Sequence, residues 1–301
     1  MRNQTDIPAV LTIAGSDSGG GAGLQADLKV FHALGCFGTT AVSCITAQNP
    51  DQVRGVEAVS AAMVAEQVRT VCDGFPIAAA KTGMLFSAEI IEAVAGVVEE
   101  CGIKNLVVDP VMVSTSEVRL LREDAVEALQ KLLIPKARVI TPNLPEAEVL
   151  LGHAIESLED LKLAAEEIGE KFGVACALKG GHLGEGRERS EVRGQRSEIS
   201  VLGSVGDEPL VDTDEHGLTQ GDSFVFDVLW CDGVLDVFSV PRVDVGETHG
   251  TGCTFAAVVT AELAKGAVIR DAVKSAQTFV AKALSMAPQV GRHTPLGVFP
   301  H

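Results

Sequence analysis

Short apolar segments alternate with helix-like segments along most of this chain, and this alternation restricts its fold more than any other feature. The apolar runs are short, whereas the segments between them carry apolar residues at helical spacing. The expected strands cover residues 9–14, 39–46, 77–80, 106–108, 138–141 and 174–178, and the expected helices cover 24–34, 61–71, 88–101, 124–133 and 158–172. This order predicts an α/β fold in which a mostly parallel sheet carries helices on both faces.

Polar or glycine residues follow most of these strands. The carboxyl ends of parallel strands meet at one edge of a sheet, and open α/β sheets bind ligands there. The residues at these ends are Gly15, Asp17, Gln48, Lys81, Met84, Asp109, Asn143 and Lys179. We therefore expect a small-molecule site along this edge.

A glycine-led helix start is the second signal, at Gly250-Thr251-Gly252-Cys253, where an apolar, alanine-rich run follows and ends at Gly266. The first amides of a helix have no intrahelical acceptor and lie at the positive end of the macrodipole. Glycines let an anion approach such amides, which indicates a site for phosphate or for developing phosphoryl charge. The same field would lower the pKa of the Cys253 thiol. A plain helix start with two turn glycines and one buried cysteine is an equal alternative.

Several polar residues have both a chemical and a structural interpretation. Asp109 and Glu146 could hold a hydrated Mg²⁺ ion, although helix capping and solvated loop acids are the commoner roles. Lys179 could meet a phosphate or face water. Asn143 could contact a ligand or cap the helix that follows it. His249 is given no role in proton transfer.

The first glycine stretch, residues 15–23, matches no nucleotide-binding loop. It lacks the GxGxxG spacing of dinucleotide sites, and the chain contains no Gly-Lys-Ser/Thr of a Walker A loop. A tight structural turn and a ligand loop are therefore equally good interpretations.

Net charge and cysteine pattern restrict the partners and the compartment. A formal charge of −17 and a pI near 4.8 argue against nucleic acid or an anionic membrane as the main partner, but not against anionic small ligands. The seven cysteines are odd in number and lack metal-site spacing, which is typical of free thiols in a reducing compartment. No signal peptide and no apolar run of 18 residues is visible, so we expect a cytoplasmic protein.

The alternating pattern is interrupted after Gly184. Residues 185–222 first mix arginine with glutamate and then carry acids without bases, a composition that buries little apolar surface. We interpret this segment as a long polar insertion within a single domain, 1–301. Beyond it, apolar alternation on both sides of Asp232-Gly233 predicts a β-hairpin.

Seven ordered sequence blocks together resemble one enzyme family. They are GSDSGGGAGLQADLK (15–29), TAQN (46–49), KTGML (81–85), DPVM (109–112), TPNLPEA (141–147), KGGH (179–182) and THGTGCT (248–254). Over nearly the whole chain outside 185–222, the sequence is similar to the hydroxymethylpyrimidine/phosphomethylpyrimidine kinases of thiamine biosynthesis, in the ribokinase-like superfamily. The resemblance implies a three-layer sandwich, a homodimer, and MgATP-dependent phosphorylation of the pyrimidine alcohol and then of its monophosphate.

The resemblance also implies roles for individual residues. The pyrimidine pocket would be lined by Gly15, Ala22, Asp27, Gln48, Met84, Val111 and Cys253. ATP would be attended by Asn143, Glu146 and Lys179, and its metal ion by Asp109 and Glu146. The anion hole would be formed by Gly250, Thr251 and Gly252. Cys253 would be the general base, at a position where much of the superfamily carries aspartate.

Two departures from the family pattern lie near the expected phosphates. Many relatives carry a basic residue where this chain has Gly246 and a neutral residue where it has Glu247, so one phosphate contact is missing. Relatives usually read Gly-Asp where this chain has Glu117 and Val118, which alters the loop near ATP.

Two other functions remain open from the sequence. One is a pyridoxal (vitamin B6) kinase of the same superfamily, and the other is a non-catalytic sensor of pyrimidine or nucleotide. Gln48 and Met84 favour the pyrimidine, because a glutamine amide can pair with both a ring nitrogen and an exocyclic amine. Lys179, Asp109 and Gly252 argue against a sensor that has lost its catalytic groups.

Overall fold

The computed structural model describes residues 7–112, 123–181, 224–243, 249–291 and 293–298 of the 301-residue chain. Within these ranges one nine-stranded sheet has the order β3-β2-β1-β4-β5-β6-β7-β8-β9. Its strands are β1 (Ala9–Ser16), β2 (Phe37–Asn49), β3 (Gln52–Ala58), β4 (Ile77–Thr82), β5 (Leu106–Val108), β6 (Val139–Ile140), β7 (Ala175–Lys179), β8 (Phe224–Cys231) and β9 (Val234–Pro241). The predicted insertion at 185–222 lies outside the described residues.

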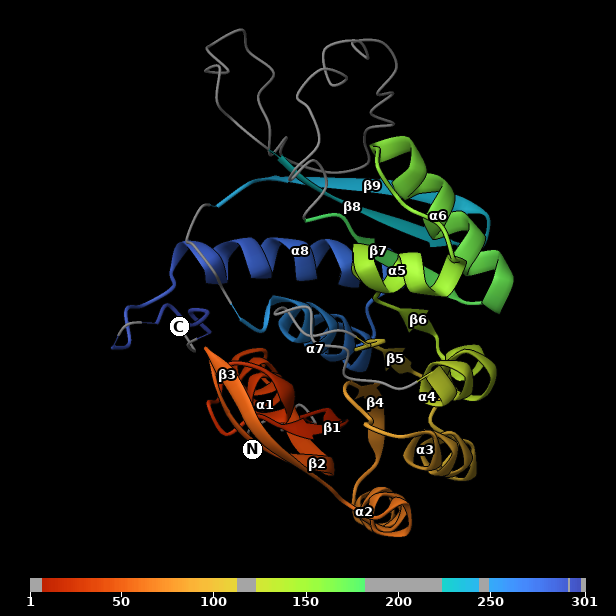
Figure 1. Cartoon of the computed structure of the whole chain (residues 1–301), viewed down its shortest axis with the longest axis vertical. Coiled ribbons are helices and arrows are strands. Elements are labelled where there is room, and N and C mark those ends of the chain that lie inside the picture. Colours follow the sequence, from red (N-terminus) through yellow and green to blue (C-terminus); the bar gives the residue numbers. More distant parts are fainter. Residues whose placement is uncertain (1–6, 113–122, 182–223, 244–248, 292, 299–301) are drawn as a thin grey trace, which may run out of the picture.

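Helices cover both faces of the sheet (Figure 1). They are α1 (Gly23–Ala33), α2 (Ala61–Gly74), α3 (Ala88–Glu100), α4 (Glu123–Ala128), α5 (Leu144–Leu151), α6 (Leu158–Phe172), α7 (Thr251–Ala264) and α8 (Ile269–Ser285), with a π-helical turn η1 (Leu129–Leu133) and a 3-10 turn η2 (Ile134–Lys136) after α4. One apolar cluster joins the sheet to α2 through α6, and a second joins its other face to α1, α7 and α8. The predicted three-layer α/β architecture is confirmed.

The middle of the sheet is parallel. The pairings of β2 with β1, β1 with β4, β4 with β5, β5 with β6 and β6 with β7 are all parallel. Antiparallel strands are added at the two ends, β3 at one and β8 with β9 at the other. The carboxyl ends of the six parallel strands therefore lie at one edge of the sheet, which is the edge where the sequence places its polar residues.

Serine and glycine residues set several helix ends as their chemistry predicts. The Ser87 side chain accepts a hydrogen bond from the amide of Ile90 at the start of α3, and Ser157 forms a capping box with Asp160 at the start of α6. Gly173 ends α6 with φ +68°, in the left-handed region that glycine adopts without steric penalty. These caps fix where the helices that connect the strands begin and end.

The strand β3 and the helix α8 were not expected from the sequence. Every residue of β3 is exposed, so the strand lacks the apolar alternation that marks a strand with one buried face. The buried face of α8 is built mainly from Ala272, Val273 and Ala276, which recur at helical spacing, so this helix was predictable from the sequence. The predicted hairpin is confirmed: Asp232 and Gly233 have φ of 51° and 78°, as a two-residue turn between β8 and β9 requires.

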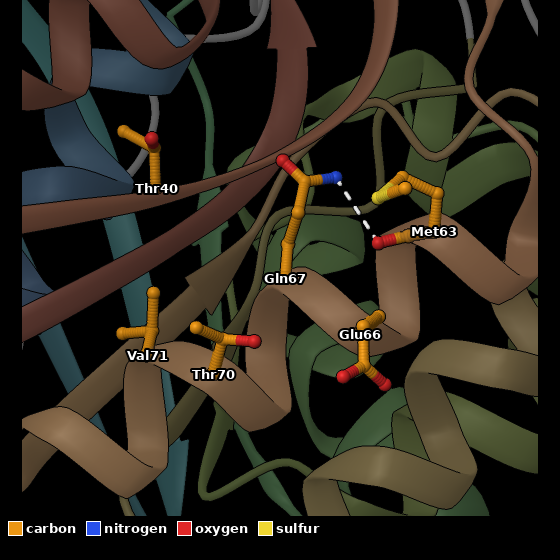
Figure 2. Close-up of a pocket in the computed structure, with 6 residues that line it drawn as sticks. All are labelled: Thr40, Met63, Glu66, Gln67, Thr70 and Val71. Carbon is orange, nitrogen blue, oxygen red and sulfur yellow. Dashed lines mark hydrogen bonds between the residues drawn. The ribbon is translucent and has the colours of Figure 1, made fainter.

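One stretch of β2 is paired with a side chain instead of a second strand. The pairing of β2 with β3 begins only at Cys44. Before it, the amide of Val42 donates to Gln67 Oε1 at 2.9 Å, and Gln67 Nε2 donates to the Val42 carbonyl at 3.1 Å. A cavity of about 240 Å³ lies beside this contact, between β2 and α2, and Figure 2 shows its lining residues. The cavity contains none of the predicted site residues.

In the described part of the chain, no helix has both the length and the apolar character needed to span a membrane.

Candidate active site

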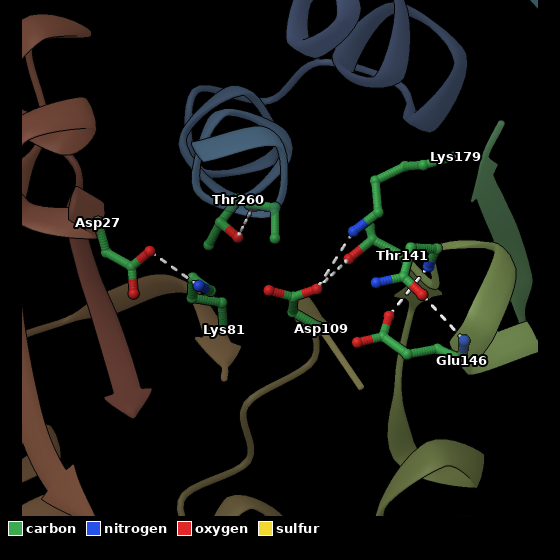
Figure 3. Close-up of polar contacts among 9 residues, drawn as sticks. Asp27, Lys81, Asp109, Thr141, Glu146, Lys179 and Thr260 are labelled. Atoms are coloured by element: carbon green, nitrogen blue, oxygen red, sulfur yellow. Dashed lines mark hydrogen bonds and ion pairs between the residues drawn. The ribbon is translucent and has the colours of Figure 1, made fainter. Parts of the chain in front are cut away.

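The strand alternation that builds the core also brings the polar side chains together. Successive side chains of a strand point to opposite faces, so residues two apart share a face. The core residues Val10, Ala79, Val107, Val139 and Ala177 pack in the cluster that contains α1 and α7. Two residues further along each strand stand Thr12, Lys81, Asp109, Thr141 and Lys179. Figure 3 shows the last four beneath α7, at the predicted edge of the sheet.

Lys81 and Asp27 form a fully buried ion pair. Lys81 Nζ lies 2.8 Å from Asp27 Oδ1, and both side chains are 0% exposed. The Thr12 hydroxyl donates to Asp27 Oδ2 at 2.6 Å. Burial opposes the charge on Lys81, but Asp27, Cys253 and Asp109 together raise the pKa of its ammonium. Asp27 is thus already engaged with two protein groups, and its predicted contact with a pyrimidine stays a prediction.

Lys179 and Asp109 form a second, looser pair. Lys179 Nζ and Asp109 Oδ1 are 3.4 Å apart, and the Thr141 hydroxyl lies 3.4 Å from the same oxygen. The other oxygen, Asp109 Oδ2, is buried without a hydrogen-bond partner. A Cβ atom added to Gly252 would lie 3.4 Å from Lys179 Nζ, so this ammonium is next to the glycine-led start of α7.

The start of α7 has the form expected of an anion site. Gly250 is its N-cap with φ +90°, and this glycine has no side chain with which to cap the first amides. A Cβ on Gly250 would lie 1.9 Å from the carbonyl oxygen of Gly21, so only glycine fits there. The structure thus packs the first glycine stretch against the second.

Asp17 organises that first glycine stretch. Its carboxylate accepts hydrogen bonds from the amides of Gly19, Gly21 and Ala22 at 2.8, 3.0 and 2.8 Å. The interpretation of residues 15–23 as a tight turn is therefore confirmed. The turn also lies at the site, because Gly21 touches Gly250.

Asn143 and Glu146 form a capping box at the start of α5. The Asn143 side chain accepts from the Glu146 amide, and Glu146 accepts from the Asn143 amide, both at 2.9 Å. Burial raises the pKa of Glu146 to about 8, although Lys179 and the amides of Asn143 and Met112 act in the opposite direction. The structural interpretation of Asn143 is confirmed, and its contact with ATP stays a prediction.

Cys253 corrects the sequence-based expectation about its thiol. Burial raises the pKa of Cys253 to about 12, whereas the helix field alone had predicted a lowered value. Lys81 and the amide of Gly23 act to lower this pKa, but removal of the thiol from water has the larger effect. The thiol is therefore protonated at neutral pH in the protein without substrates.

The remaining predicted pyrimidine residues lie around the same loops. A Cβ on Gly15 would lie 3.2 Å from Met84 Cε, so Met84 covers the end of β1. Gln48 Nε2 lies 3.0 Å from His249 Nε2, which joins the end of β2 to the loop before α7. Val111 follows β5 and is partly exposed. The blocks of the sequence that carry these residues thus converge at one end of the sheet.

Asp227 was missed by the sequence reasoning. It is buried on β8 opposite Lys179, and it accepts from the Gly180 amide at 3.1 Å and from Gln277 Nε2 at 3.0 Å. Burial raises its pKa to about 6. A single acid within the apolar run FVFDVLW (224–230) was the available signal.

The donor set fits a magnesium ion that keeps most of its water. No group of three or more His, Cys, Asp or Glu side chains that could enclose a metal occurs within the described ranges. The unpartnered Asp109 Oδ2 is the donor that suits Mg²⁺, which uses few carboxylates together with water and phosphate. The departures at Gly246-Glu247 and Glu117-Val118 lie outside the described residues.

Known proteins match both the sequence and this arrangement. A family model described as Phosphomethylpyrimidine kinase matches residues 17–203 and 202–297. The hydroxymethylpyrimidine/phosphomethylpyrimidine kinase of Bacillus subtilis (strain 168) is 38% identical over 294 residues, which cover 97% of this chain and 95% of that protein. The crystal structure of the phosphomethylpyrimidine kinase of Clostridium difficile 630 has a TM-score of 0.71 at 34% identity and covers 92% of this chain and 99% of that one. The pyridoxal kinase of Staphylococcus aureus in complex with AMP-PCP and pyridoxal has a TM-score of 0.76 at 32% identity, over 98% and 95% of the two chains.

Proposed function

This chain belongs to the phosphomethylpyrimidine kinase family, and we propose that it transfers a phosphoryl group from ATP to hydroxymethylpyrimidine and then to the resulting monophosphate. It is a kinase of thiamine biosynthesis. The observation that supports this reaction best is the approach of Lys179 Nζ to Gly252 at the glycine-led start of α7. A mostly buried ammonium and the first amides of a helix at one point suit a phosphoryl group in transfer.

The nucleotide half of the site would be built from Lys179, Asn143 and Glu146. Lys179 would balance the charge of the transferred phosphoryl group while the amides of Thr251 and Gly252 hold its oxygens. Asn143 and Glu146 fix the start of α5, whose first amides face the same edge of the sheet. This assignment places ATP over the carboxyl ends of β5, β6 and β7.

The acceptor half would be built around β1, β2 and β4. The pyrimidine ring would be enclosed by Gly15, Ala22, Met84 and Val111. Gln48 would form hydrogen bonds to the ring nitrogens after its amide leaves His249. Asp27 would act there through its fixed position beneath the first glycine stretch. Cys253 lies between the two halves, in the first turn of α7, where it would accept the proton of the attacking hydroxyl as thiolate.

Magnesium would be held on the nucleotide side. Bound with ATP, Mg²⁺ neutralises phosphate charge and fixes phosphate geometry. Asp109 would contact it through Oδ2, directly or through water. Glu146 already accepts from the amides of Asn143 and Met112, so it would have to leave the capping box to become a direct ligand.

The pyridoxal kinase alternative is not favoured. Three relatives that are 37–39% identical over 97% of this chain carry the pyrimidine kinase name, and the family model does as well. The likeness to pyridoxal kinases is nevertheless a reason to include pyridoxal in any test.

The test is a product analysis by mass spectrometry. The purified chain is incubated with MgATP and, separately, with hydroxymethylpyrimidine, its monophosphate and pyridoxal. We expect phosphorylation of both pyrimidines and much slower turnover of pyridoxal. Equal or faster turnover of pyridoxal would overturn the substrate assignment, and binding of ATP without any product would favour the sensor.

Three further expectations remain predictions. We propose one domain over 1–301, a homodimer, and a cytoplasmic location. Light scattering after size exclusion tests the homodimer, and a single cooperative unfolding transition tests the single domain.

A further inference from the structure

Five buried or nearly buried titratable side chains, acids alternating with lysines, form a row beneath α7. Figure 3 shows Asp27, Lys81 and Asp109 from left to right, with Lys179 and Glu146 beyond Asp109. The second cation of this row, Lys179, belongs to the nucleotide half of the site. The first, Lys81, has no role in the reaction as described so far, although it is the more deeply buried of the two.

Lys81 is held rigidly by parts of three elements. Its own strand is β4, Asp27 comes from α1, and Thr12 of β1 holds the second oxygen of Asp27 at 2.6 Å. An ammonium carries three N–H donors, and Asp27 Oδ1 takes one of them at 2.8 Å. Burying such a charge is expensive unless it is paired, so its retention at the edge of a ligand site calls for a reason beyond packing.

Cys253 is the group of the reaction on which Lys81 acts. α7 packs against β4, and the Cys253 thiol in the first turn of α7 faces the amide of Gly23 at the start of α1. Asp27, which holds Lys81 Nζ at 2.8 Å, lies one helical turn after Gly23. The ammonium is therefore near the thiol, and the two groups influence each other electrostatically. The other charged groups around this thiol are Asp27 and Asp109, which oppose a thiolate, and Lys179, which favours it. Among the charged groups, Lys81 acts most strongly on the thiol, and the Gly23 amide at the start of α1 acts in the same direction.

We propose that Lys81 is a positioning residue for this kinase: its ammonium, fixed by Asp27 and Thr12, stabilises the negative charge on Cys253 Sγ. In the reaction, the acceptor hydroxyl gives its proton to that thiolate, its oxygen bonds to the γ-phosphorus, and the bond from this phosphorus to the departing ADP oxygen breaks. Lys81 itself transfers no proton. The catalytic consequence rests on the proposed function, but the charge effect can be measured without substrates.

The experiment measures the alkylation of Cys253 by iodoacetamide between pH 7 and 10. The full chain is used without ATP, metal or acceptor, and each thiol is followed by peptide mass spectrometry. The thiolate is the species that reacts. We expect Lys81→Met to lower the alkylation rate of Cys253 by about tenfold, the effect of one pKa unit. We expect Asp27→Asn to raise this rate. Lys162→Met, which removes an exposed positive charge on α6, should change nothing.

Opposite changes in the alkylation rate of Cys253 in Lys81→Met and Asp27→Asn separate an electrostatic effect from damage to the fold. A loosened protein would alkylate faster in both variants, and the buried Cys44 and Cys176 would report this in the same sample. If Lys81→Met is loosened in this way, the double variant Asp27→Asn/Lys81→Met removes both charges and should still slow Cys253. An unchanged or faster Cys253 in the intact single variant, or in the double variant when it is needed, would show the proposal to be wrong. If the wild-type chain does not phosphorylate pyrimidines, but Lys81→Met still slows the alkylation of Cys253, then the proposed function is overturned and the charge effect stands.

Discussion

The two lysine–carboxylate pairs beneath α7 are built differently. Lys81 and Asp27 are 2.8 Å apart and fully buried, and a third group completes the hydrogen bonding of the carboxylate. Lys179 and Asp109 are 3.4 Å apart, the Lys179 side chain is 13% exposed, and one Asp109 oxygen has no partner. Both lysines stand near the carboxyl ends of parallel strands of one sheet, Lys81 on β4 and Lys179 on β7, so the difference comes from their surroundings and not from their place on a strand.

The difference separates a group that holds the site from a group that binds ligand. A complete pair has little to gain from a ligand, whereas an incomplete one can exchange a long contact for a phosphate oxygen or a metal ion. In the proposed assignment, the closed pair would lie on the acceptor side and the open pair on the nucleotide side. The following substitutions test whether this contrast is real.

Removing one partner of the closed pair should give the largest loss of stability. Lys81→Met leaves the Asp27 carboxylate buried without its cation, which lowers the free energy of unfolding by about 3–5 kcal/mol. Lys179→Met should lower it by clearly less, because Lys179 is partly exposed and its contact is long. Urea denaturation of both variants, with Lys162→Met as the surface control, makes the comparison. Equal losses at the two lysines would remove the contrast.

Catalytic activity should depend strongly on the open pair, although this pair contributes less to stability. Lys179→Met removes the ammonium beside Gly252, and we expect kcat/KM for MgATP to fall by about 10²–10³-fold, as for the loss of one preorganised group that stabilises transition-state charge. Steady-state kinetics with hydroxymethylpyrimidine as acceptor would measure it. A decrease of less than tenfold would mean that Lys179 only faces solvent.

Asp227 sharpens the comparison, because in the described part of the chain its buried carboxylate accepts hydrogen bonds from neutral groups, the Gly180 amide and Gln277. Burial raises its pKa from 3.8 to about 6. A carboxylate with a raised pKa in the folded state contributes most to stability below pH 3.8, and that contribution is lost as the pH rises through 6. A rise of this size corresponds to about 3 kcal/mol at most. Asp227→Asn should therefore gain stability relative to the wild type between pH 4 and pH 8.

The measurement for Asp227 is the difference in free energy of unfolding between variant and wild type at both pH values. Asp271→Asn, at an exposed acid in the first turn of α8, is the control and should show no comparable trend. A constant difference at Asp227 would mean that its carboxylate is solvated.

Cys253 lies at the boundary of the two halves, and its loss should affect turnover more than folding. We expect Cys253→Ala to lower kcat by about 10²-fold, the low end for the loss of a general base. Cys253→Asp should keep more activity than alanine if proton transfer matters, and thermal unfolding should change little in either variant. An alanine variant that turns over at nearly the wild-type rate would leave Cys253 as a wall of the pocket.

The smallest effect is expected at Gln48. Gln48→Leu leaves polar groups of the pyrimidine unpaired and should weaken its binding by about 1–3 kcal/mol. Calorimetric titration of hydroxymethylpyrimidine would measure this. Gln67→Leu, which removes the amide that pairs with β2 at Val42, is the matched control for a change along the same strand and should leave affinity unchanged. Equal weakening by both changes would point to a general effect on β2.

The sheet edge and most of the helices could be predicted from the sequence, because the spacing of apolar residues and the capping residues are local signals. The sequence was insufficient where the partner is distant. Nothing near Lys81 shows that its ammonium meets Asp27, which is 54 residues away in the chain. The hydrogen bond from Gln277 to Asp227 could not be predicted for the same reason.

Cys253 shows a different limit of sequence reasoning. The field at the start of α7 is a local property and was predicted, but the burial that raises the pKa of the thiol depends on how α1, β4 and α7 pack together. α8 differs, because its buried residues Ala272, Val273 and Ala276 recur at helical spacing, so this helix was predictable from a local pattern. For Cys253, by contrast, the missing information is tertiary.

The contact between Gly21 and Gly250 links the evolution of two loops that are more than 200 residues apart. Because a Cβ at position 250 would lie 1.9 Å from the Gly21 carbonyl oxygen, no side chain can enter there unless the first loop moves as well. We therefore expect descendants of this chain to change acceptor more readily through side chains elsewhere, such as Gln48 at the end of β2 and Met84 in the loop after β4. In a saturation library selected for growth without thiamine, position 250 should tolerate glycine alone, whereas these two positions should tolerate several residues.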